Sequence, residues 1–132
     1  MRAINLVMSC GALGGLTAVM LGAYGAHGLD AMSLSSQRAY NSAAQYQFYH
    51  SLALVLTSLA MHWRSCNWLL SAAFGFGAGL LLFCGSIYLR LLLGIEVPGW
   101  LTPTGGIAFM LGWGTLMVAA WINTKERVCR SS

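Results

Sequence analysis

The side chains best able to do chemistry lie in one polar stretch of an otherwise apolar chain. The ten residues that end at His50 read Asn-Ser-Ala-Ala-Gln-Tyr-Gln-Phe-Tyr-His, and an apolar run follows them. On a helix, Tyr46, Gln47 and His50 share one face, and Gln45 lies beside it. Exposing an amide or imidazole to lipid is expensive, so we expect this face to point into a helical bundle or a wet cavity.

The histidines have two readings each. His50 serves either as a ligand or proton-handling group, or as a buried histidine that donates a hydrogen bond to a neighbouring helix. His27 either caps a helix end or joins His50 at a metal ion. Two histidines without a nearby carboxylate or thiolate are a weak metal signal, so we predict no metal site and no cofactor. Gln45 and Gln47 are most simply explained as hydrogen-bond partners between helices.

Further polar residues fall at a similar depth once the chain is folded into antiparallel helices. They end the first and third apolar segments and open the fourth, so they gather in the half of the bundle away from both chain termini, the outer half. We therefore predict a polar pocket or network that opens at this end. The candidate ligand-binding or network residues are His27, Gln45, Tyr46, Gln47, His50, Ser86, Tyr88 and Thr104.

The composition decides which class of protein positions these groups. The chain has 132 residues, of which 58% are hydrophobic and 8% are charged. Soluble domains carry about 25% charged residues, and disordered chains carry few aromatic and apolar ones. The net charge of +4 comes mostly from scattered cations, whereas a nucleic-acid surface needs clustered ones. These figures exclude a soluble domain and a disordered chain, and they leave an integral membrane protein that does not bind nucleic acid.

Four segments are long enough to cross a bilayer as helices, which requires about 20 residues. We predict spans at residues 4–26, 40–61, 67–89 and 103–122. The connections are short, so neighbouring helices should run antiparallel. The predicted fold is all-α: an antiparallel four-helix transmembrane bundle that forms a single membrane domain over residues 1–132, with a short basic tail at 123–132.

The basic residues predict the orientation of this bundle. Both termini and the link between the second and third spans lie on one side, which carries more cations than the other. Cations mark the cytoplasmic side, so we expect cytoplasmic termini. The cations on the predicted inner side are Arg2, Arg64, Lys125, Arg127 and Arg130, and those on the outer side are Arg38 and Arg90.

Small residues recur at three- and four-residue steps along the first and third spans. Such faces let helix backbones approach closely in lipid, where the hydrophobic effect between helices is weak. We expect them to pack the bundle internally, and the alternative is that they dock another copy or a partner. The predicted packing glycines are Gly11, Gly15, Gly22, Gly75 and Gly79.

Several motifs together resemble the YgdD-like family of small bacterial inner-membrane proteins of unknown function, which is related to the mitochondrial transmembrane protein 256. They are Gly-Ala-Tyr-Gly-Ala-His-Gly-Leu at 22–29, Ala-Gln-Tyr-Gln-Phe-Tyr-His at 44–50, Gly-Ser-Ile-Tyr-Leu at 85–89, Thr-Pro-Thr-Gly-Gly at 102–106 and Gly-Trp at 112–113. The resemblance runs from Ile4 to about Ile122 and implies four helices in the cell inner membrane. It implies no activity, cofactor or catalytic residue. Arg90 departs from the family pattern, where we expect an uncharged residue.

These features favour a multi-pass inner-membrane protein that is not an enzyme. We expect an accessory protein that sits in the lipid bilayer, binds a lipid, a membrane-protein partner or a second copy, and carries a polar pocket in its outer half. The alternative is a small transporter or channel component that uses this pocket. Small drug exporters rely on a carboxylate inside a span, and all three acidic residues lie outside the predicted spans. Catalysis by Ser86 with His50 as base would lack an acidic group to orient the base.

Overall fold

The computed structural model describes the backbone of residues 1–64 and 66–131 and the side chains of residues 1–64 and 66–122. Within these residues the chain is entirely helical and contains no strand, which confirms the predicted all-α class. The elements are α1 (Arg2–His27), α2 (Leu34–Trp63), α3 (Asn67–Gly79), η1 (Leu80–Cys84), α4 (Gly85–Leu92) and α5 (Leu101–Ser131).

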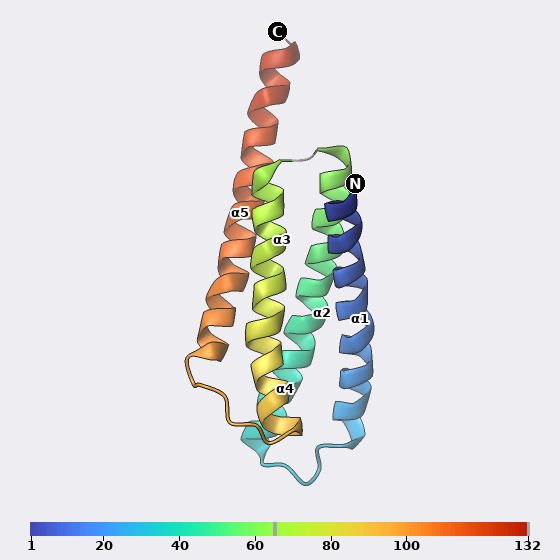
Figure 1. Ribbon diagram of the computed structural model, residues 1–132, viewed down its shortest axis with the longest axis vertical. Coiled ribbons are helices and arrows are strands. Elements are labelled where there is room, and N and C mark those ends of the chain that lie inside the picture. The colour runs from blue at the N-terminus through green and yellow to red at the C-terminus, as the bar shows by residue number, and fades with distance from the viewer. Residues whose placement is uncertain (65, 132) are drawn as a thin grey trace.

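The helices form two pairs joined along their length (Figure 1). Helix α1 packs against α2, and α5 packs against α3 and η1. Helix α2 also contacts α3, η1 and α4, so it connects the two pairs. The N-terminus, the α2–α3 link and the C-terminal part of α5 lie towards one end of the molecule, and the α1–α2 and α4–α5 connections lie at the other (Figure 1).

Helix α2 begins six residues before the predicted span at residue 40, because Ser33 provides an N-cap. The Ser33 hydroxyl accepts a hydrogen bond from the Ser36 backbone N–H at 3.3 Å, which satisfies one of the free donors in the first turn. Helix α5 begins at Leu101 and holds Pro103 in its first turn, where no N–H partner is lost. Its backbone stays helical to Ser131, through most of the predicted tail at 123–132, whose side chains lie outside the described residues.

The predicted third span is one continuous helix that contains a π-helical turn, η1, between α3 and α4. Such a turn adds one residue to the helix, and each residue turns the helix by about 100°. The turn therefore changes which side chains of α4 face the rest of the bundle. The chain leaves α4 through Gly94, whose φ of +65° is disfavoured for other residues.

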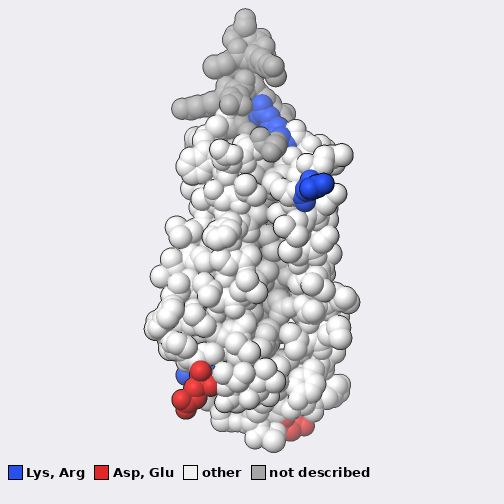
Figure 2. Space-filling model, in the orientation of Figure 1, with Lys and Arg blue, Asp and Glu red and all other residues white. Residues whose placement is uncertain are grey.

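Three helical segments are long and apolar enough to cross a membrane: Arg2–His27, Asn67–Leu92 and Leu101–Ile122. Helix α2 is also long, but its polar first half keeps it out of this set. Charged side chains lie near the two ends, and the flank between them is uncharged in the face drawn in Figure 2. The apolar core lies between α2, α3 and α5 and includes Leu54, Phe76 and Phe109.

Candidate functional site

His50 lies in the interior of the bundle with 5% of its surface exposed. Its Nδ1 lies 2.7 Å from the Tyr46 carbonyl oxygen of the preceding turn, and the Trp113 indole N–H donates to Nε2 at 3.2 Å. A neutral ring that carries its proton on Nδ1 satisfies both contacts. Both ring nitrogens are therefore engaged within the chain, and His50 connects α2 to α5.

Aromatic rings surround the imidazole and hold it in place. His50 stacks on Phe109 with ring centroids 3.6 Å apart and an interplanar angle of 16°. Phe76 and Trp113 approach it at 5.9 and 6.1 Å, and Tyr46 packs edge-on against Phe83 nearby. This packing excludes water from the ring and fixes its orientation.

Gln47 lies one turn from His50 but points to the other side, towards α1. Its amide N–H₂ donates to the Gly14 carbonyl at 3.0 Å and to the Thr17 hydroxyl at 2.7 Å. Its Oε1 is buried and has no hydrogen-bond partner among the described residues, and the same holds for the hydroxyl of Ser51. Gln47 thus joins α1 to α2 through the backbone of α1.

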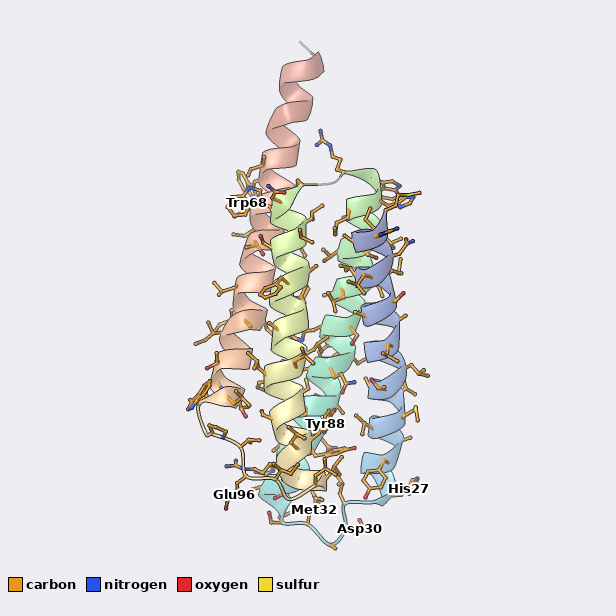
Figure 3. All side chains as sticks on the ribbon, viewed as in Figure 1. His27, Asp30, Met32, Trp68, Tyr88 and Glu96 are labelled. Atoms are coloured by element: carbon orange, nitrogen blue, oxygen red, sulfur yellow. The ribbon has the colours of Figure 1, made fainter. Side chains whose placement is uncertain are left out.

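A group of tyrosines lies between these contacts and the outer end. The Tyr40 hydroxyl donates to the Leu21 carbonyl of α1 at 2.8 Å, and the Tyr40 ring contacts Tyr88 edge-on at 5.4 Å. Figure 3 marks Tyr88 on α4, towards the end that carries Asp30 and Glu96. The Tyr88 hydroxyl is buried without a partner in the described part of the chain, so this region has spare hydrogen-bonding capacity.

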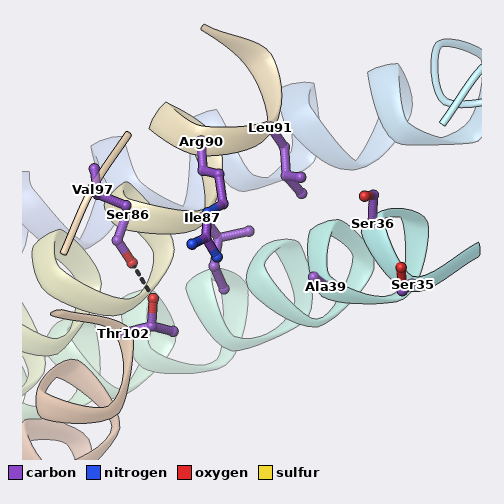
Figure 4. A pocket seen from close by; sticks show the side chains of 9 residues that line it. All are labelled: Ser35, Ser36, Ala39, Ser86, Ile87, Arg90, Leu91, Val97 and Thr102. Carbon is purple, nitrogen blue, oxygen red and sulfur yellow. Dashed lines mark hydrogen bonds between the residues drawn. The ribbon is translucent and has the colours of Figure 1, made fainter. Parts of the chain in front are cut away.

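Ser86 contributes to a cavity of about 230 Å³ at the outer end. Its hydroxyl donates to the Phe83 carbonyl at 2.9 Å and lies 2.7 Å from the Thr102 hydroxyl of α5 (Figure 4). The cavity lies between the first turns of α2, the end of α4, Val97 in the α4–α5 connection, and Thr102. Arg90 is its one charged lining residue.

The structure therefore divides the predicted site residues among separate places. Gln47, His50 and Ser86 are buried in three different environments, and Tyr88 packs against Tyr40. Ser86 is the one predicted site residue that lines the outer cavity. The remaining candidates are exposed: His27 at the end of α1, Gln45, Tyr46, and Thr104, whose hydroxyl bonds to the Trp100 carbonyl.

The predicted packing glycines also divide. A Cβ atom at Gly11 would meet the Ser51 carbonyl of α2 at 2.9 Å, and one at Gly75 would meet the Gly112 Cα of α5 at 2.8 Å. Gly79 lies directly against the Phe109 ring. A Cβ at Gly15 or Gly22 would meet nothing within 4 Å. These two glycines are not needed for packing within the chain, and their docking to another molecule stays a prediction.

Sequence reasoning missed most of the partners of these side chains. Trp113 lies in the middle of the predicted fourth span, and a tryptophan at that depth is a usable signal for an indole N–H that needs a hydrogen-bond partner within the bundle. Thr17 and Thr102 could not be identified as partners in this way, because a threonine hydroxyl in a helix can be satisfied locally. Thr17, for example, also donates to the Leu13 carbonyl of its own helix, and Thr102 bonds to the Ser86 hydroxyl. Within the described residues, no group of three or more His, Cys, Asp or Glu side chains is arranged to hold a metal ion.

Comparisons with known proteins identify the chain's relatives. The model of a protein family of unknown function, DUF423, matches residues 21–106. A UPF0382 membrane protein of Staphylococcus aureus is 36% identical over 126 residues, which cover 89% of this chain and 97% of that protein. The UPF0382 membrane protein YwdK of Bacillus subtilis is 38% identical over 112 residues, covering 83% and 91%.

A third relative is named for the membrane in which it lies. The UPF0382 inner membrane protein YgdD of Escherichia coli is 33% identical over 117 residues, which cover 88% of each chain. No solved structure matches the chain significantly. With several helices able to cross a membrane, the chain is a multi-pass protein of the cell inner membrane. It belongs to the DUF423 family and to the UPF0382 membrane proteins, which include YgdD.

Proposed function

We propose that this protein is a non-catalytic binding protein of the inner membrane, which engages a lipid or a membrane-protein partner at the outer end of a four-helix antiparallel transmembrane bundle. The observation that carries the proposal is the contrast between an interior histidine whose ring nitrogens are both engaged and an open cavity lined by a cation. His50 has both ring nitrogens engaged, so it offers no free base for catalysis. Arg90 lines the outer cavity with no ion pair among the described residues.

The burial pattern of α2 supports a fourth span. Its polar side chains Gln47, His50 and Ser51 are buried, and Leu52, Leu56 and Leu59 on its other faces are exposed. A helix that hides polar groups and exposes leucines is suited to lipid even when its mean hydropathy is modest. The basic residues at the end that carries both termini favour a cytoplasmic location for that end.

One observation favours the alternative of a small transporter or channel component. Three buried polar atoms, on Gln47, Ser51 and Tyr88, have no partner among the described residues. Buried polar atoms of this kind attract water, and water would give a path into the outer half. The absence of an acidic residue inside the spans weighs against proton coupling.

Native mass spectrometry of the protein, gently extracted at its natural expression level, tests the proposal. We expect a stoichiometric partner protein or a retained lipid in the complex. A chain that carries neither, and that supports uptake or release of a solute when reconstituted, would replace the binding role by the transporter.

The topology has its own test, which uses cysteines in a background without the natural ones. A cysteine at Ser35, in the outer turn of α2, should react with a membrane-impermeant reagent in intact cells. A cysteine restored at position 66, in the α2–α3 link, should react after lysis only. The reverse labelling pattern would place the termini outside the cell.

A further inference from the structure

The outer cavity has the lining of a site for an oxyanion. It has room for a tetrahedral group, since a single water needs only about 10–15 Å³ of such space. Its lining combines one guanidinium, four hydroxyl groups and several aliphatic side chains. The lining residues with polar groups are Arg90, Ser35, Ser36, Ser86 and Thr102.

The charge at this cavity is positive and uncompensated. Arg90 is exposed, so its guanidinium is reachable from water, and it makes no ion pair or hydrogen bond within the described residues. No carboxylate lines the cavity. Glu96 lies in the connection that follows α4 but is absent from the lining. A guanidinium presents its N–H groups as a planar fork that fits the oxygen atoms of a phosphate.

The hydroxyl groups divide into occupied and available donors. Ser86 gives its proton to the Phe83 carbonyl, so Thr102 must donate to Ser86 and its proton is also used. On the opposite wall, Ser33 donates to the Ser36 hydroxyl at 3.0 Å. The hydroxyl proton of Ser36 itself has no acceptor in the described structure, and it is free to bond an anion in the cavity.

The remaining lining residues are apolar, and an apolar surface beside a cation suits the part of a phospholipid where the headgroup meets the glycerol backbone. Ile87, Leu91 and Val97 give the cavity an apolar side beside the guanidinium. The cavity also lies near the outer end of the helices, where the exposed Trp100 marks a membrane interface. A headgroup phosphate sits at this level of a bilayer.

We propose that the cavity between α2, α4 and α5 binds a phosphate group through Arg90 and Ser36, supplied by an anionic phospholipid headgroup or by free phosphate. The inference deepens the proposed function, on which it rests, by naming the chemistry of the ligand. Arg90 and Ser36 act as binding residues, and Ser86 and Thr102 form a wall whose donors are already occupied.

Binding can be measured on the full chain purified in a sugar detergent, by native mass spectrometry with three probes. The probes are short-chain phosphatidylglycerol, inorganic phosphate, and a diacylglycerol of the same chain length that lacks the phosphate. We expect retention of phosphatidylglycerol or phosphate, and no specific retention of diacylglycerol. Tighter binding of phosphatidylglycerol assigns the headgroup as the source, and equal or tighter binding of inorganic phosphate assigns the free anion.

Variants locate the binding. Arg90→Gln should weaken it at least about tenfold, because it removes the charge and a fork of donors. Ser36→Ala should weaken it about threefold, because it removes one hydroxyl donor. Arg38→Gln is the matched control, because Arg38 is an exposed cation near the same end that does not line the cavity. Thermal unfolding of each variant checks that it folds.

Three results would overturn the phosphate site: unchanged binding in a folded Arg90→Gln variant, an equal loss in Arg38→Gln, or equal retention of diacylglycerol. The proposed function fails by a different result. If the natural complex contains a partner protein but no phosphate probe binds, the phosphate site alone is wrong. If the natural complex contains neither partner nor lipid, the binding role itself is wrong.

Discussion

The two helix pairs of this protein are joined by different physical means. Between α3 and α5, glycines on both helices let the backbones touch: Gly75 faces Gly112, and Gly105 lies directly against the backbone of Phe83 in η1. Between α1 and α2, side chains reach across to backbone carbonyls, from Gln47 to Gly14 and from Tyr40 to Leu21. Gly11 also brings α1 close to the backbone of α2. The α1–α2 contact therefore combines shape with hydrogen bonds, whereas the α3–α5 contact depends on shape.

The difference predicts how each pair responds to substitution. In lipid, close backbone packing and interhelical hydrogen bonds both drive helix association, and a single hydrogen bond contributes only about 0.6–2 kcal/mol. A side chain forced into a backbone contact can cost more stability than one hydrogen bond contributes, because it must push the two helices apart. We therefore expect the α3–α5 contact to be the less tolerant of the two.

The largest effect should come from Gly105→Val. The new side chain would meet the backbone nitrogen and Cα of Phe83, neither of which can move without displacing η1. We expect a loss of about 3 kcal/mol or more in the free energy of unfolding, at the upper end of overpacking effects. Unfolding in detergent micelles, followed by circular dichroism, measures the change.

The neighbouring residue supplies the matched control for this substitution. A Cβ at Gly106 would meet nothing within 4 Å, so Gly106→Val should change the stability by less than about 0.5 kcal/mol, as surface substitutions do. Equal losses in the two variants would mean that the close approach of Gly105 to the Phe83 backbone does not govern the stability of this region.

His50→Ala should have the next largest effect, because it removes one of the links between the two pairs. The substitution removes a ring stacked on Phe109 and leaves the Trp113 N–H without its acceptor. We expect a loss of about 2 kcal/mol, for the cavity and the lost hydrogen bond together. Thermal unfolding tests this value, and the native complex should keep its composition if His50 is structural. A variant as stable as the natural chain that loses its partner or lipid would make His50 a binding residue.

Gln47→Leu tests the α1–α2 contact and should have a smaller effect. It removes both hydrogen bonds to α1, and the unpaired Oε1 disappears with them. We expect a loss of about 1 kcal/mol, in the range of membrane hydrogen bonds. The exposed Gln45 gives the control Gln45→Leu, which should change little. A loss as large as that of Gly105→Val would contradict the expectation that the α1–α2 hydrogen bonds tolerate substitution better than the α3–α5 backbone contact.

How far the sequence predicts this arrangement depends on the kind of contact. The polar face of α2 had to be buried, because Gln47 and His50 cannot face lipid, and both are buried. Their partners did not follow from the sequence, since neighbouring side chains on one face can turn to different helices. No sequence pattern indicated the π turn at Leu80–Cys84 either. This turn sets the directions in which Ser86 and Arg90 point. The early start of α2 at Leu34 follows from the Ser33 cap, a signal available in the sequence.

The smallest effect concerns the small residues of α1 that the chain does not use. Gly15→Ala and Gly22→Ala place a methyl group where no atom lies within 4 Å. Alanine favours a helix over glycine by up to about 1 kcal/mol, so the isolated chain should be unchanged or slightly more stable. Their importance would appear in association: if this face docks a second copy or a partner, Gly15→Leu should release that molecule in native mass spectrometry without lowering the stability of the chain. Retention of every associated molecule in Gly15→Leu and Gly22→Leu would leave this face to lipid.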